Sequence, residues 1–134
     1  MALVQKIIVL KEVNIPEAII TLRSDRIMLV HYNKDITIDV ETQLMMREIY
    51  KQMAPGKRLD YIFSASSGVS FTKEARENPS DVANSPIASY AIIANNLAYR
   101  LIANFYLKVI KPRVPYRLFS DIDEAVEWLH SRNS

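Results

Sequence analysis

The sequence predicts one α/β domain in which a mixed, mostly parallel sheet is opened by a β-hairpin and flanked by about four helices. The 134 residues suit a single domain, and the apolar (49%) and charged (24%) fractions both lie near globular averages. Short apolar segments alternate with segments of helical spacing, which is typical of parallel strands joined by crossover helices. Two apolar segments near the N-terminus are separated by only a few polar residues, which favours an antiparallel hairpin.

The N-terminal part is expected to supply three strands. The first runs from Val4 to Val13 and belongs to an N-terminal extension, residues 1–16. Its apolar run is short and interrupted by lysines, so it predicts neither a signal peptide nor a membrane span. The other two strands, Ala18–Leu22 and Ile27–Tyr32, flank the polar turn Ser24-Asp25-Arg26 and form the hairpin.

A helix is expected to begin at Asp39 and to end before Pro55-Gly56. Apolar residues recur through it at helical spacing, which predicts one core-facing side made by Val40, Leu44, Met45, Ile49 and Met53. The adjacent Met45 and Met46 are interpreted as core filler. Leu59–Ala65 then has the β-branched and aromatic character of a strand.

Two elements are expected after a serine-rich loop. Thr72 is suited to cap a short helix that reaches Arg76. The segment Ile87–Ala94 is nearly all apolar, which is typical of a strand buried on both faces of a parallel sheet.

The C-terminal part is predicted to hold a short strand, Tyr116–Phe119, and a closing helix. Asp121 and Glu124 resemble a capping box at the start of that helix. Residues 131–134 are expected to fray at the chain end.

The helix expected from Asn96 to about Ile110 is apolar on nearly every side. Such a helix must be buried by something: the rest of the domain, a second subunit or a lipid-like ligand. Self-association is the favoured interpretation, with a twofold-symmetric homodimer as the default geometry. Core burial within one chain is the alternative.

Composition excludes several kinds of chemistry. The chain has no cysteine, which rules out disulfides and thiolate catalysis and suits a reducing, cytoplasmic location. The net charge of +2, from 17 basic and 15 acidic residues, is too balanced to predict nucleic-acid binding. The two histidines, His31 and His130, show no metal-ligand spacing and are expected to be structural or merely exposed. No cofactor and no metal site is predicted.

Three stretches together resemble a known family. They are Phe71–Glu77, Arg100–Leu107 followed by Lys111-Pro112, and Val114–Asp121 running into Glu124–Leu129. In this order and spacing they resemble the SpoIIAA-like group of STAS-type bacterial domains, a largely uncharacterised branch related to anti-sigma-factor antagonists. The resemblance covers roughly residues 17–130. It implies a mixed sheet flanked by helices, and a regulatory or interaction role rather than catalysis.

The sequence departs from that family at three places. Phosphorylatable relatives open the helix after the third core strand with a serine, but Ser66-Ser67-Gly68 precedes the expected helix, so a phosphoserine switch is not transferred. Ser64 stands where the branch often has an acidic residue, and Ala103 stands where it commonly has glycine.

Two groups of polar residues are candidate binding sites. A hydroxyl-rich loop that leads into a helix start suits a protein partner or an anion, although turn formation and capping alone also explain its residues Ser66, Ser67, Ser70, Thr72, Lys73 and Arg76. A crevice at the carboxyl ends of parallel strands would be lined by Asn95, Asn96 and Arg100, together with Ser66 and Ser67.

The function expected from these observations is a non-enzymatic regulatory or interaction module that acts through protein–protein contact. The alternative is a small-molecule or lipid-binding domain that uses the crevice. A hydrolase built on the serine-rich loop is a third and weaker hypothesis, because no histidine and carboxylate are spaced to serve it.

Overall fold

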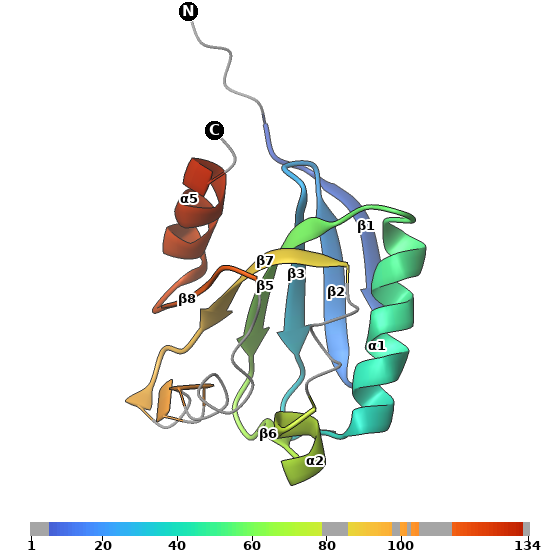
Figure 1. Cartoon of the computed structure of the whole chain (residues 1–134), viewed down its shortest axis with the longest axis vertical. Helices are drawn as coiled ribbons and strands as arrows, with labels where there is room; N and C mark the ends of the chain where they lie inside the picture. Colours follow the sequence, from blue (N-terminus) through green and yellow to red (C-terminus); the bar gives the residue numbers. More distant parts are fainter. Residues whose placement is uncertain (1–5, 79–85, 98–99, 102, 105–113, 133–134) are drawn as a thin grey trace, which may run out of the picture.

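A computed structural model describes residues 6–78, 86–97, 100–101, 103–104 and 114–132. Its centre is a six-stranded sheet in the order β1-β2-β3-β5-β7-β8 (Figure 1). Among these residues, no helix is long and apolar enough to cross a membrane.

The first three strands pair antiparallel. They are β1 (Val9–Asn14), β2 (Ala18–Arg23) and β3 (Ile27–Tyr32), and the β2–β3 pair confirms the predicted hairpin. Strand β1 begins later than expected, since residues 6–8 are not assigned to a strand and residues 4–5 lie outside the described chain.

The remaining strands of the sheet pair parallel, which confirms the mostly parallel prediction. They are β5 (Leu59–Ala65), β7 (Ile87–Ile93) and β8 (Tyr116–Phe119), and β5 pairs with β3. A separate two-stranded sheet, β4 (Thr37–Ile38) with β6 (Ser70–Phe71), was not predicted, because two residues are too few to show an alternating pattern.

Three helices are described in full: α1 (Val40–Met53), α2 (Lys73–Arg76) and α5 (Ile122–Arg132). About four were expected, and the fourth, from Asn96 to Ile110, falls largely outside the described residues; its residues 97, 100, 101, 103 and 104 are helical.

The caps of these helices are the ones predicted from sequence. Asp39 accepts a hydrogen bond from Thr42 N at 2.8 Å, and Asp121 accepts one from Glu124 N at 2.9 Å. Fraying was expected from residue 131, but helix α5 continues through Ser131 and Arg132, and the Ser131 hydroxyl donates to Trp128 O at 2.7 Å.

The core lies in two layers, one on each face of the sheet. Helix α1 packs on one face, where Met28, Val30 and Tyr61 meet Met46, Tyr50 and Met53. Helix α5 packs on the other face, where alternate residues of the same strands, Ile27, Ile62 and Ala91, meet Ala125 and Leu129. The strand period of two therefore divides the apolar residues between two helices.

The predicted core side of α1 was wrong in part. Leu44 and Met45 are 48% and 40% exposed, whereas Gln43 and Arg47 are buried. Gln43 is held inside because its amide donates to Ala75 O at 3.0 Å and accepts from Asn78 Nδ2 at 3.2 Å. The hydrogen-bonding needs of this polar residue thus turn the helix away from the position that hydrophobicity alone predicts.

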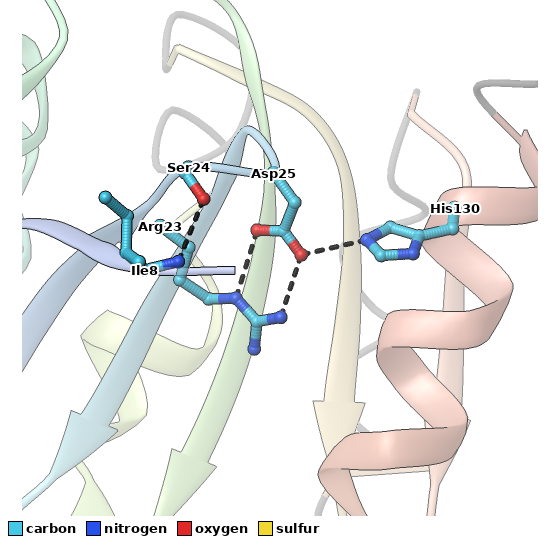
Figure 2. Close-up of polar contacts among 5 residues, drawn as sticks. All are labelled: Ile8, Arg23, Ser24, Asp25 and His130. Carbon is cyan, nitrogen blue, oxygen red and sulfur yellow. Dashed lines mark hydrogen bonds and ion pairs between the residues drawn. The ribbon is translucent and has the colours of Figure 1, made fainter. Parts of the chain in front are cut away.

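The β2–β3 turn is joined to α5 by a carboxylate (Figure 2). Arg23 Nε donates to Asp25 Oδ1 at 3.0 Å, and Arg23 Nη2 donates to Asp25 Oδ2 at 2.8 Å. His130 Nε2 also lies 2.8 Å from Asp25 Oδ2. Burial raises the pKa of Asp25, but the hydrogen bonds and charges of Arg23 and His130 outweigh burial and leave this pKa below its ordinary value of 3.8. This carboxylate ties the C-terminal helix α5 to the turn between β2 and β3, in the antiparallel part of the sheet.

Removing the Asp25 carboxylate should therefore destabilise the fold. We expect Asp25→Ala to lower the free energy of unfolding by about 1–3 kcal/mol at neutral pH, because two nitrogen-bearing partners lose a charged acceptor. The lowered pKa means that this contribution is present above pH 3.8 and disappears as the pH falls through the folded-state pKa. Urea unfolding of both proteins should thus show a difference that shrinks in acid.

Glu48→Ala is the matched control, since it removes an exposed carboxylate 3.5 Å from Lys51. It should change stability by less than about 0.5 kcal/mol. An Asp25→Ala protein as stable as this control at neutral pH would contradict the role assigned to Asp25.

Candidate functional site

Polar residues gather at the carboxyl ends of β3 and β5, on the face of the sheet that also carries α5. His31 lies near the end of β3, and the parallel register places it opposite Ser64 of β5. Its ring nitrogens contact two hydroxyls, with Nδ1 at 2.8 Å from Ser64 Oγ and Nε2 at 2.8 Å from Ser66 Oγ. Ser64 is only 8% exposed, so its hydroxyl depends on this contact.

The chemistry of this cluster follows from the imidazole. A neutral histidine has one donor and one acceptor nitrogen, so one serine donates its proton to the ring and the other accepts one. A protonated ring has two donors, and both serines must then accept. Because hydroxyls occupy both ring nitrogens, neither nitrogen faces the carboxylate that orients the histidine of a hydrolytic triad.

The loop after β5 is held tightly against the loop after β3. Ser66 N donates to Tyr32 O at 2.9 Å, and Asp35 N donates to Ser67 O at 3.0 Å. Gly68 has a φ of +78°, and a Cβ atom there would lie 2.0 Å from Asp35 Oδ1. A glycine is required at this position both for its backbone conformation and for the close approach of Asp35.

The predicted serine-rich loop is divided between two places. Ser66 lies at the His31 cluster and Ser67 O accepts from Asp35 N beside it, whereas the later residues lie in β6, at the cap of α2 and in α2. Ser70 Oγ lies 3.2 Å from Thr37 Oγ1, and Thr72 caps α2 by accepting from Ala75 N at 3.1 Å.

The two cations of the predicted loop lie on α2. Lys73 is exposed, and Arg76 is half-buried with its Nε atom lacking a hydrogen-bond partner among the described residues. Helix α2 is a single turn of four residues, so the anion-binding helix start expected there is only minimally formed.

The predicted crevice residues serve different purposes. Asn95 and Asn96 are exposed beyond the end of β7. Arg100 instead ties two strand ends together, since its Nη2 donates to Ala94 O at 3.3 Å and to Ser120 Oγ at 3.4 Å.

A small cleft, with an accessible volume of about 20 Å³, lies on the opposite face of the sheet, under α1. The predicted crevice residues do not line it; its walls are Tyr32, Gln43, Met46, Arg47, Tyr50, Phe63 and Ile87.

The His31 cluster was not predicted from sequence, because each histidine was considered alone. A usable signal was present: His31 and Ser64 stand near the carboxyl ends of two strands in a sheet predicted to be mostly parallel. Both residues also fall on the same face as apolar residues two positions earlier, Leu29 and Ile62. Pairing the strands in register would have brought the two side chains together.

The close approach at Gly68 leads to a stability test with an internal control. Gly56 also has a positive φ, of +69°, but a Cβ there would meet nothing within 4 Å. Both glycine-to-alanine variants incur a backbone cost of about 1–2 kcal/mol. Gly68→Ala should cost about 1 kcal/mol more, because Asp35 must move.

Chemical denaturation of the two variants measures that difference. In an Asp35→Gly background the extra cost should vanish, because the carboxylate that meets the new Cβ is gone. Equal losses for Gly56→Ala and Gly68→Ala in the unmodified chain would show that the two loops are not in close contact.

Comparison with known proteins places this fold in a family without an assigned function. No curated protein matches the chain. A solved structure from Shewanella loihica, an uncharacterised protein of the DUF3478 family with a SpoIIAA-like fold, matches with a TM-score of 0.54 and 9% identity, over 96% of this chain and 98% of that one. This likeness shows the fold alone, and it confirms the SpoIIAA-like fold predicted from the three sequence stretches. The family model described as a domain of unknown function, DUF7793, matches residues 20–133, so the chain belongs to the DUF7793 family.

Proposed function

We propose that this protein is a non-enzymatic interaction module that regulates by protein–protein contact through the helix after β7. One observation carries the proposal: Leu97 is 71% exposed and Leu101 is 60% exposed. Residues four apart lie on the same side of a helix, so the two side chains form one apolar surface, which we call the leucine pair.

The leucine pair stands on a fixed support. Arg100 N donates to Asn96 O at 3.1 Å, and its side chain bonds to Ala94 and Ser120 at the ends of two strands. Arg100 is therefore anchored to the sheet while Leu97 and Leu101 are exposed. Large apolar side chains presented together are typical of surfaces that bury themselves against a partner.

The absence of catalysis is part of this proposal, and the His31 cluster supports it. Both ring nitrogens contact serine hydroxyls, an arrangement that holds the end of β5 and its loop in place. We therefore assign His31 to positioning the loop at the carboxyl edge.

Binding of a small molecule is the second candidate function. The observation that favours it is the partly exposed side of the His31 cluster at Ser66. Ser66 is partly exposed, and its hydroxyl lies 2.8 Å from His31 Nε2, which would suit a small polar ligand at this edge. Native mass spectrometry of the purified protein, with and without His31→Leu, separates this role from the first.

The leucine pair is tested by comparing partners captured with variants of the chain. We expect Leu97→Glu combined with Leu101→Glu to lose one specific host protein, with at least about a tenfold drop in affinity, because two apolar anchors are replaced by charges. The matched control is Leu44→Glu, a similarly exposed leucine on α1.

Quantitative pull-down followed by titration calorimetry with the captured protein gives the measurement. The proposal is contradicted if the double variant and the control retain every captured protein equally well while both remain folded by circular dichroism.

A further inference from the structure

We infer that two copies of this chain form a dimer through the edge of the sheet. The segment Ile7 to Val9 of one copy pairs antiparallel with the same segment of the other, about a twofold axis at Ile8. The segment continues directly into β1, which is the last strand of the six-stranded sheet and pairs with β2 on one side. Its other side pairs with no strand of the described residues and lies at the outside of the sheet in Figure 1.

The first observation is an exposed apolar run on this edge. Four consecutive residues are between 41% and 59% exposed: Ile7, Ile8, Val9 and Leu10. An edge of this kind is usually protected, because unpaired backbone beside apolar side chains recruits another strand. Consecutive exposed apolar residues place such side chains on both faces of any ribbon formed here.

The second observation is the direction of the backbone groups. Ile8 O accepts from Ser24 N at 2.9 Å, and Ile8 N donates to Ser24 Oγ at 3.0 Å, a contact drawn in Figure 2. The polar backbone groups of Ile8 therefore point toward β2. Because these directions alternate along extended backbone, we infer that those of Ile7 and Val9 point toward the outer edge.

The third observation limits how far a partner can pair. The register of β1 on β2 shifts between Val9 and Lys11, which marks a bulge. The Lys11 ammonium donates to Met53 O at 3.1 Å and so fixes the strand to the end of α1. A bulge with a lysine is a common way to block edge pairing, and it leaves only the stretch before it available.

These constraints select one register. With the axis at Ile8, Ile7 of one copy faces Val9 of the other, and both have outward backbone groups. A shift by one residue in one direction places Lys6 opposite Lys11, which repels, and a shift in either direction pairs inward with outward backbone groups. An axis at Val9 places Ile7 opposite Lys11, inside the bulge. Only the register centred on Ile8 is both apolar and regular.

The pairing is short, which sets its strength. Two facing pairs supply about four backbone hydrogen bonds, and the contact area lies below the ~1,200 Å² of a standard interface. We therefore expect a weak dimer, with a dissociation constant on the order of micromolar or higher. This surface does not include the leucine pair. A test of the dimer is therefore independent of a test of the proposed partner contact.

Single-cysteine variants test the register, because the natural chain has no cysteine. In Ile8→Cys the two sulfurs face each other across the axis, with Cβ atoms about 4.5–5.5 Å apart, close to the range that a disulfide bridges. Leu10→Cys is the control: Leu10 is similarly exposed, but the register separates the two copies of this residue by roughly 13 Å along the strand. Under mild oxidation, Ile8→Cys should form a covalent dimer at least about tenfold faster than Leu10→Cys, as followed on non-reducing gels.

Sedimentation of cysteine-free protein tests the dimer itself. Val9→Lys should reduce the dimer fraction severalfold, while Leu44→Lys, which alters an exposed leucine on α1, should leave it unchanged. Because Val9 is 59% exposed, its replacement should leave the fold intact by circular dichroism. A protein that stays monomeric at all concentrations, or a Leu10→Cys variant that cross-links as fast as Ile8→Cys, overturns the proposal.

Discussion

The parallel pairing of β3 with β5 is the constraint on which the rest of the structure depends. It joins the antiparallel N-terminal part to the parallel C-terminal part, in a register that runs from Ile27 opposite Asp60 to Tyr32 opposite Ala65. Both strands are covered on both faces, by α1 on one side and α5 on the other. A slip of one residue would exchange the two faces and mismatch the side-chain packing in both layers.

That register gives the two ends of the sheet different characters. At the carboxyl end it brings His31 beside Ser64 and fixes the loop of Ser66. At the other end it leaves the β2–β3 turn free to reach α5, where Asp25 bonds to His130. The partner surfaces that we propose lie outside this fixed frame, at the leucine pair and at the outer edge before β1.

Much of this frame could be predicted from sequence, because its signals are local. The hairpin, the apolar strand at Ile87 and the caps at Asp39, Thr72 and Asp121 each depend on a few neighbouring residues. Periodicity and capping therefore predicted the order of the main helices and strands, and the SpoIIAA-like resemblance predicted the fold that they form.

The parts that sequence did not predict depend on contacts between distant residues. The inward position of Gln43 is set by Ala75, and the two-stranded β4–β6 sheet pairs residues 33 positions apart. The His31 cluster needs residues from β3, β5 and the following loop at once. None of these has a period or a motif, so each becomes visible only when the tertiary arrangement is known.

The most direct measurement of that register is the set of nuclear Overhauser effects from the His31 ring in isotope-labelled protein. The account predicts contacts from the ring protons to the β-protons of Ser64 and Ser66. Contacts to Phe63 or to Ala65 in their place would show that β3 and β5 are paired one residue out of register, and would contradict the account.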